Sequence, residues 1–310
     1  MPGKLFDAVG IGLNSVDLLC VVERHPPFNT KGPLLEVSRQ GGGQAATAMA
    51  ALARLGLRTA YIGAVGDDEE GAFSLQSLRE EGVDVEGVVA QPGRASQFAV
   101  ILVQRGGPPG ERGGRTILWR REVELRPGEV REDIVRAARL IHVDGHNIEA
   151  ELRAAEWAKE EGVPVSFDAE RALPGTEALV RRTDYLVASE EFPAAFTGGL
   201  PLEEALRAIH RLGPRVAAAT LGERGAVAFD GERFHRAPAF AVEAVDTTGA
   251  GDVFHAGFVF GALQGYPLPR TLRFANAVAA MSCRRLGGRA ALPRLAEAEE
   301  FMRQAGPLRA

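Results

Sequence analysis

Cysteine is scarce in this sequence, and long hydrophobic runs are absent from it. The 310 residues include two cysteines, Cys20 and Cys283, which lack the paired, closely spaced pattern of a disulfide framework or a zinc motif. We therefore expect free thiols, no zinc and a cytoplasmic location. No run approaches the roughly 18 apolar residues of a membrane span, and residues 1–12 lack the pattern of a secretory signal. These absences argue against export and membrane insertion.

An excess of positive charge is also lacking. The net charge is −5, so the chain as a whole does not attract nucleic acid or anionic membranes. Hydrophobic residues make up 45% and charged residues 25%, as in an ordinary globular protein with one large α/β domain or two smaller ones. Chemistry on a small molecule fits these properties better than binding to a polymer.

Short apolar segments alternate with helical stretches over most of the chain. The apolar segments predict buried strands at residues 6–11, 59–64, 140–143, 163–167, 185–188 and 216–220. Helices are predicted at residues 45–55, 149–161, 202–212, 251–263 and 272–285. This alternation is typical of a mostly parallel sheet with helices on both faces.

Two regions interrupt the alternation. Residues 13–41 and 95–121 contain alternating segments around turn-forming residues, and these predict β-ribbons. We expect the ribbons to form a small β-sheet lid. Residues 1–12, 42–94 and 122–310 would then form the α/β core that binds nucleotide and carries the catalytic residues. A cleft between lid and core is a favoured place for a ligand.

The most informative motif is DTTGAGD at residues 246–252, which leads into a predicted helix. Its small residues let the backbone N–H groups of Gly249, Ala250 and Gly251 approach an anion, because a helix N-terminus favours negative charge. Asp252, in the first turn, then stands beside that anion and can accept the proton of an attacking hydroxyl. A structural alternative is that Asp252 only complements the helix dipole and the glycines only make a turn.

DTTGAGD followed by Val, Phe, His, Ala and Gly resembles the C-terminal signature of the PfkB, or ribokinase-like, carbohydrate kinases. GGGQAATAMA from Gly41 is similar to the N-terminal signature of that family. The resemblance implies a ribokinase-like three-layer α/β/α core with a mostly parallel sheet and a small β-sheet lid. It also implies an ATP-dependent kinase acting on a hydroxyl of a small sugar, with Asp252 as catalytic base and Gly249, Ala250 and Gly251 as anion hole. RTILWRRE, LIHVDGHN and VSFDAE resemble the ketohexokinase or fructokinase-like branch, so a ketohexose or modified ketose is expected.

The same resemblance assigns further residues to the sugar. Asp17 corresponds to an early aspartate that holds sugar hydroxyls in the family, and relatives often carry asparagine where Gln44 and Thr47 stand. Both replacements still donate and accept hydrogen bonds, but they change the reach of the side chain. The expected substrate-binding residues are Asn14, Asp17, Gly42, Gly43, Gln44, Thr47 and Arg120.

A third segment, TLGERG at residues 220–225, matches the nucleotide side of the family, although by itself it predicts only a β-turn. Asn276 and Cys283 lie seven residues apart on a predicted helix, so both can face the same way, where related kinases line the adenine. The expected nucleotide-binding residues are His146, Thr220, Gly222, Gly225, Asn276, Cys283 and Gly288.

The family's NxxE element, linked to magnesium and phosphate, is replaced here by SEEF at residues 189–192. Carboxylates in or near that position are the candidates for Mg²⁺. They are Glu190 and Glu191, with Asp168 and Glu170 as alternatives.

The resemblance also bears on partners and on a second ion. A monovalent cation, commonly potassium in the family, is expected near Asp246 and Thr248. The exposed edges of the lid predict a homodimer formed through the lid. Two alternatives remain open: a nucleoside or other small-polyol kinase of the same fold, and a sugar or nucleotide sensor without turnover.

Overall fold

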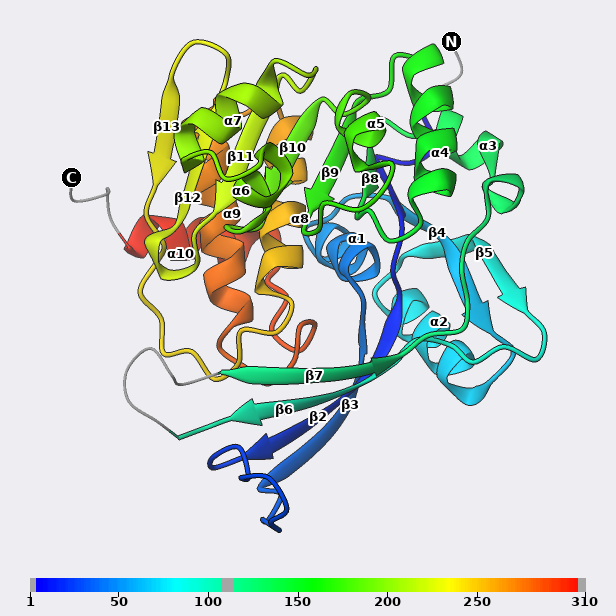
Figure 1. Ribbon diagram of the computed structural model, residues 1–310, viewed down its shortest axis with the longest axis vertical. Coiled ribbons are helices and arrows are strands. Elements are labelled where there is room, and N and C mark those ends of the chain that lie inside the picture. The colour runs from blue at the N-terminus through cyan, green and yellow to red at the C-terminus, as the bar shows by residue number, and fades with distance from the viewer. Residues whose placement is uncertain (1–3, 107–113, 306–310) are drawn as a thin grey trace.

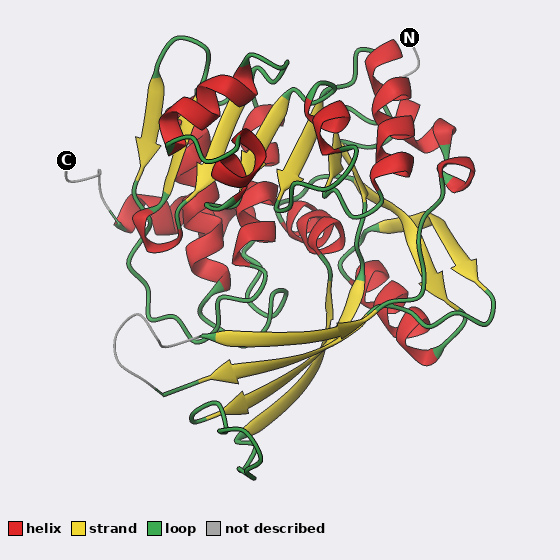
Figure 2. Cartoon of the chain, viewed as in Figure 1, coloured by secondary structure: helices red, strands yellow, loops and turns green. Residues whose placement is uncertain are grey.

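A large mixed sheet forms the centre of the molecule (Figures 1 and 2). The computed structural model describes residues 4–106 and 114–305. The sheet has nine strands in the order β13-β12-β11-β10-β9-β8-β1-β4-β5. All neighbouring pairs from β11 to β5 are parallel, and only β12 and β13 are antiparallel to their neighbours. The strands are β1 (Ala8–Ile11), β4 (Thr59–Gly66), β5 (Asp84–Gln91), β8 (Ile141–Val143), β9 (Val165–Ala169), β10 (Tyr185–Ala188), β11 (Val216–Thr220), β12 (Ala226–Phe229) and β13 (Phe234–Ala237).

Helices cover both faces of this sheet. Successive residues of β1 show why, because Ala8 belongs to the core on one face and Val9 to the core on the other. One face packs against α3 (Glu132–Arg136), α4 (Ile148–Glu160), α5 (Thr176–Val180), α6 (Phe192–Thr197) and α7 (Leu202–His210). The other packs against α1 (Gln44–Arg54), α2 (Glu69–Glu80), α8 (Ala250–Leu263), α9 (Leu268–Ser282) and α10 (Leu295–Gln304).

The predicted three-layer α/β/α core with a mostly parallel sheet is therefore confirmed. All six predicted strands and all five predicted helices are present, with boundaries shifted by a few residues. The sequence did not predict β5, because this strand forms an edge of the sheet and most of its residues are only partly buried. An edge strand of this kind lacks the continuous apolar run that marks a strand covered on both faces.

A second, smaller sheet stands apart from the core, in the order β3-β2-β6-β7. Its strands are β2 (Ser15–Val22), β3 (Glu36–Gly42), β6 (Phe98–Gln104) and β7 (Arg115–Arg120). The pairs β2/β3 and β6/β7 are antiparallel, as the predicted ribbons require, and a parallel β2/β6 pair joins them. Residues 107–113 of the second ribbon lie outside the described part of the chain. We call this four-stranded unit the small sheet; the exact division between core and lid stays a prediction.

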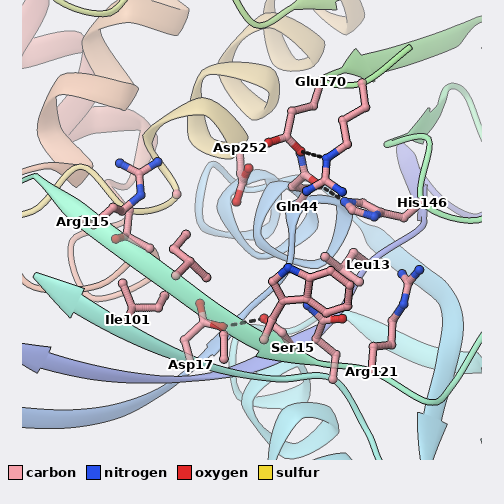
Figure 3. Close-up of a pocket in the computed structure, with 18 residues that line it drawn as sticks. Leu13, Ser15, Asp17, Gln44, Ile101, Arg115, Arg121, His146, Glu170 and Asp252 are labelled. Carbon is pink, nitrogen blue, oxygen red and sulfur yellow. Dashed lines mark hydrogen bonds and ion pairs between the residues drawn. The ribbon is translucent and has the colours of Figure 1, made fainter. Parts of the chain in front are cut away.

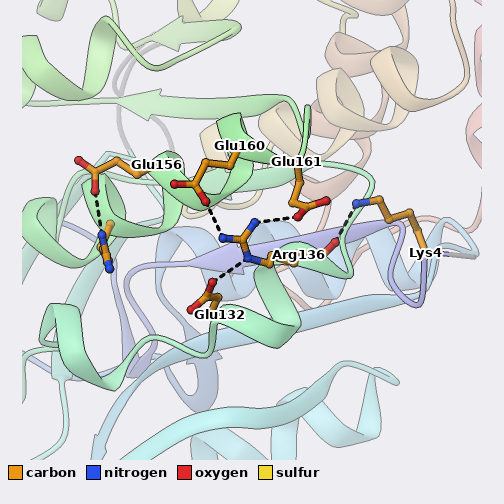
Figure 4. A network of polar contacts seen from close by, with 7 residues as sticks. Lys4, Glu132, Arg136, Glu156, Glu160 and Glu161 are labelled. Atoms are coloured by element: carbon orange, nitrogen blue, oxygen red, sulfur yellow. Dashed lines mark hydrogen bonds and ion pairs between the residues drawn. The ribbon is translucent and has the colours of Figure 1, made fainter. Parts of the chain in front are cut away.

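Arg136 ties α3 to the end of α4 (Figure 4). Its guanidinium lies 2.7 Å from Glu132, 2.5 Å from Glu160 and 2.7 Å from Glu161. Lys4 donates to its carbonyl oxygen over 2.7 Å and so fixes the start of the described chain. Because these side chains are exposed to solvent, which screens their charges, the ion pairs add little to the stability of the fold.

Both cysteines are buried and form no disulfide, as the sequence predicted. Within residues 4–106 and 114–305, no helix combines the length and the apolar character needed to cross a bilayer. The helix that begins within the DTTGAGD motif, α8, is a central element of the core, where it packs against both α1 and α9.

Close approach between α8 and α9 depends on Gly257. A Cβ atom there would lie 2.6 Å from the Cα of Ala275 and 2.6 Å from a methyl group of Val278. We expect Gly257→Ala to destabilise the fold by about 1–3 kcal/mol, although alanine has the higher helix propensity. Urea unfolding measures the change. Gly128→Ala, in the short 3₁₀ turn η1 (Pro127–Glu129), is the control, because a Cβ there meets nothing within 4 Å. Equal stability of the two variants contradicts the prediction.

Candidate functional site

A pocket of about 250 Å³ lies between the small sheet and the core (Figure 3). The sheet contributes side chains from β2, β6 and β7, and the core contributes the starts of α1 and α8 with the loops that follow β8 and β9. The lining residues are Leu13, Ser15, Asp17, Gly43, Gln44, Gln97, Ala99, Ile101, Arg115, Ile117, Trp119, Arg121, His146, Glu170, Arg171, Thr248, Gly249 and Asp252.

Asp252 lies in the first turn of α8 with its carboxylate directed into the pocket. Burial raises the pKa of this carboxyl group well above its ordinary value, and the negative charges of Asp168 and Asp144 raise it further. Gly249 is the N-cap of this helix; its φ of 73° is left-handed, and its missing side chain admits the Cα of Gly288. A base of raised pKa thus stands beside a helix N-terminus, where an anion is favoured.

The loop before α8 is held by Asp246, which is 1% exposed. One carboxylate oxygen accepts hydrogen bonds from the N–H (2.9 Å) and the hydroxyl (2.8 Å) of Thr248, and the other accepts from the N–H of Gly287 (2.9 Å). Both oxygens are therefore occupied by protein donors. A cation near Asp246 and Thr248 would have to be bound mainly by other oxygen atoms of this loop.

Asp17 faces Asp252 across the pocket from β2 (Figure 3). It accepts a hydrogen bond of 2.7 Å from the hydroxyl of Ser15. Burial raises the pKa of Asp17, whereas the Ser15 hydrogen bond and the positive charge of Arg289 act in the opposite direction. The carboxylate occupies the space beside Gly42, where a Cβ would lie 2.0 Å from one of its oxygens. Gly42 therefore makes room for Asp17.

Gln44 and His146 form a second wall of the pocket. The side-chain oxygen of Gln44 bonds to Nε2 of His146, and its nitrogen lies 3.4 Å from oxygens of both Asp168 and Glu170. Contacts of 3.4 Å are long for hydrogen bonds, so a ligand oxygen can compete for this amide. The structure places His146 with the predicted sugar-side residues and not with the predicted nucleotide-side ones.

Four of the residues predicted to bind sugar do not line the pocket: Asn14, Gly42, Thr47 and Arg120. Asn14 donates to the hydroxyl of Ser74 over 3.0 Å, and Thr47 is buried and accepts a bond of 3.2 Å from Arg289. Arg120 lies on β7 between pocket residues Trp119 and Arg121, and since successive side chains of a strand point to opposite faces, it faces away.

Gly43 does line the pocket, but its φ of 88° and a Cβ position 2.5 Å from the Cα of Asn14 show that it is needed for a close turn.

Apart from His146, the predicted nucleotide-side residues lie in the core outside this pocket. Thr220 ends β11 and donates to the carbonyl of Ala188 over 3.3 Å, while Gly222 and Gly225 make the turn into β12 with positive φ angles. The amide of Asn276 donates to the carbonyls of Ala237 (2.9 Å) and Pro238 (3.1 Å), and the thiol of Cys283 bonds to the carbonyl of Ala279. Of the described residues in this set, only His146 lines the pocket.

The carboxylates predicted for Mg²⁺ lie apart from the pocket. Glu190 is exposed and pairs with Arg224, and Glu191 stands exposed at the start of α6. Of the alternatives, Glu170 lines the pocket and Asp168 lies behind it.

Asp168 belongs to a buried cluster with His142 and His255. Its oxygen lies 3.0 Å from Nε2 of His255, and the donor atoms of the three side chains lie within 4.8 Å of one another. Burial lowers the pKa of His142 to about 3, so this imidazole is neutral. Burial also acts to raise the pKa of Asp168, but His255 lowers it overall. The donor types suit a transition metal, and the existing hydrogen bond also explains the cluster without one.

Sequence reasoning missed several cations of the site. Arg115, Arg121 and Arg171 line the pocket, and Arg115 donates to the hydroxyl of Thr247 over 2.8 Å. Arg289 is buried beneath the small sheet at 6% exposure. An arginine in a ribbon or a glycine-rich loop ordinarily lies in solvent, so the sequence held no signal for these positions.

Comparison with known proteins places the chain among kinases. The family model described as "pfkB family carbohydrate kinase" matches residues 6–295. The ATP-dependent ribose-1-phosphate kinase of Halopiger xanaduensis is 32% identical over 89% of this chain and 91% of its own. The protein named "Probable fructokinase-5" of Arabidopsis thaliana is 27% identical over 84% of this chain and 88% of its own. Among solved structures, a ribokinase of Arabidopsis thaliana complexed with ribose and ATP has a TM-score of 0.80 at 24% identity, covering 96% of this chain and 98% of its own.

Proposed function

The chain belongs to the PfkB family of carbohydrate kinases, and on that premise we propose that it transfers the γ-phosphate of ATP to a hydroxyl of a small sugar bound between Asp17 and Asp252. The family and the ribokinase-like fold predicted from DTTGAGD and GGGQAATAMA are confirmed. The observation that carries the proposal is that both carboxylates enter one pocket of about 250 Å³, with Asp252 at the N-terminus of α8.

In the proposed reaction Asp252 accepts the proton of the attacking hydroxyl. Its surroundings raise its pKa, which makes it a stronger base than an exposed aspartate. The backbone at Gly249, Ala250 and Gly251 is proposed to stabilise the charge on the moving phosphoryl group. Asp17 and Gln44 are proposed to bind the sugar, because an ionised carboxylate accepts bonds from several hydroxyls and an amide both donates and accepts.

We propose that ATP binds on the side of Thr220, Gly222 and Gly225. Asn276, Cys283 and Gly288 complete the proposed nucleotide site. Mg²⁺ bound with ATP would neutralise phosphate charge, and its oxygen preference fits Glu190 and Glu191, although Glu190 must first release Arg224. A potassium ion near Asp246 and Thr248 also remains a proposal, as does a cytoplasmic location.

Replacing Asp252 by asparagine tests the catalytic base. We expect Asp252→Asn to lower kcat by about 10² or more, within the range for loss of a general base, while the KM of the sugar changes little. In the unaltered enzyme, kcat/KM should fall as pH drops through the raised pKa of Asp252, so the acid limb should lie above the ordinary value near 4. ADP release measures both. Asp133→Asn, at an exposed position of α3, is the control. An unchanged kcat in Asp252→Asn contradicts the role of Asp252 as base.

The substrate is proposed from two sources. The resemblance to the ketohexokinase or fructokinase-like branch favours a ketohexose or modified ketose. The pocket favours a second candidate, a sugar that already carries a phosphate, because Arg115, Arg121 and Arg171 all line it. Guanidinium groups match phosphate oxygens in charge and geometry, and the Halopiger relative is named as a ribose-1-phosphate kinase.

A panel of fructose, ketodeoxygluconate, ribose, ribose 1-phosphate and nucleosides distinguishes these candidates by ATP-dependent ADP release.

If the substrate already carries a phosphate, Arg121→Met should raise the KM of that substrate by about 10–100-fold, because the variant loses a hydrogen bond between two charged groups. Arg120→Met is the matched control, since Arg120 is the adjacent arginine and faces away from the pocket. Equal effects of the two variants contradict an anion site. Silence across the panel favours the sensor alternative.

A homodimer through the small sheet is also proposed. Several large apolar side chains are exposed on or beside its edge strands β3 and β7, including Val37 at 53% and Leu118 at 61%. Exposed edges and apolar side chains of this kind favour association.

Sedimentation equilibrium tests this association directly. We expect a dimer for the unaltered chain and a monomer for Leu118→Glu, because a buried unpaired charge opposes association. Leu173→Glu is the control, since Leu173 is an exposed leucine (44%) of the core. A monomeric unaltered chain contradicts the proposal.

A further inference from the structure

Arg289 is a buried cation directly behind the small sheet. It lies in the loop between α9 and α10, and its guanidinium donates to three uncharged acceptors. These are the carbonyl of Gly42 (2.6 Å), the hydroxyl of Thr47 (3.2 Å) and the hydroxyl of Ser77 (3.4 Å). Within the described part of the chain, no carboxylate lies within 4.0 Å of it. One side chain thus joins β3, α1 and α2.

Burying a charge without a direct ion pair is costly, and anchoring three neutral acceptors does not by itself require a charge. Burial lowers the pKa of Arg289 to about 10, so the group is still cationic at neutral pH. The carboxylates that act on it most through space are Asp17 and Asp252. The positive charge of Arg289 therefore acts on the carboxylates of the pocket, although its side chain does not line the pocket.

Two adjacent glycines of β3 lie between Arg289 and Asp17. A Cβ on Gly41 would lie 2.5 Å from Nη1 of Arg289, and a Cβ on Gly42 would lie 2.0 Å from an oxygen of Asp17. Because adjacent residues of a strand face opposite sides, Arg289 and Asp17 pack against opposite faces of β3. Gly42 also pairs in register with Ser15, whose hydroxyl bonds to Asp17.

We propose that Arg289 is a positioning residue for sugar binding, which fixes the base of β3 from behind and keeps Asp17 ionised to accept sugar hydroxyls. The inference rests on the proposed function, because it assigns Asp17 to the sugar. Asp17 needs a nearby positive charge because other carboxylates lie around it. The negative charge of Asp246 disfavours ionisation of Asp17, and the charge of Asp17 in turn raises the pKa of Asp252. Arg115, Arg121 and Arg171 are the cations that line the same pocket.

Two substitutions separate the charge of Arg289 from its geometry. Arg289→Met removes both, so we expect the KM of the best sugar of the panel to rise at least about tenfold. We expect kcat and the KM of ATP to change less than about threefold, and the acid limb of kcat/KM for the sugar to move to higher pH. Arg289→Lys keeps the charge but loses the planar fork. In Arg289→Lys, the acid limb of kcat/KM should therefore return to the pH of the unaltered enzyme, while the KM of the sugar should stay raised. Arg285→Met, an exposed arginine of the same loop, is the control.

The outcomes are distinct. If Arg289→Met lowers only the melting temperature and leaves the sugar KM and acid limb unchanged, Arg289 is merely structural and the inference is overturned. If Arg289→Met does not fold, Arg289→Lys decides: an unchanged KM contradicts the positioning role, and a displaced acid limb contradicts the charge role. An unaltered enzyme that turns over no sugar overturns the proposed function itself, and this inference with it.

Discussion

The carboxylate of Asp246 is the interaction on which the geometry of the pocket depends. Its bonds to Thr248 set the start of α8, and its bond to Gly287 fixes the C-terminal loop. That loop packs Gly288 against Gly249 and carries Arg289 to the base of β3. Buried hydrogen bonds to a charged group contribute about 1.5–3 kcal/mol each. One aspartate therefore relates α8 to the small sheet, although the two lie in different parts of the fold.

Opposing charges give the pocket its character. Burial raises the pKa of both Asp17 and Asp252, and the charge of Asp17 raises that of Asp252 further, while arginines from the ribbon and the loops also line the pocket. The acids suit hydroxyl groups, and the arginines suit phosphate. This combination agrees with a kinase site, where a polyol and a highly charged donor meet.

The sequence predicted the motifs better than the contacts of individual residues. Asn14 and Thr47 were expected to bind the sugar, yet the amide nitrogen of Asn14 donates to Ser74 and the hydroxyl of Thr47 accepts from Arg289. Arg120 was expected in the pocket, but its neighbours Trp119 and Arg121 take that place. A shift of one residue in the register of a strand moves each of its side chains to the other face of the sheet. The face on which Arg120 lies could therefore not be decided before the register of β7 was known.

The sequence by itself determined the alternating α/β core, the two ribbons, the helix that starts at DTTGAGD and the family. Each of these follows from local periodicity or from residues that are contiguous in the chain, and such signals do not depend on what lies across space. Only the tertiary structure decided that Gly41 and Gly42 make room for Arg289 and Asp17, and that His146 joins Gln44. These contacts join segments far apart in the chain, and their energies depend on burial and distance, which exist only once the chain is folded.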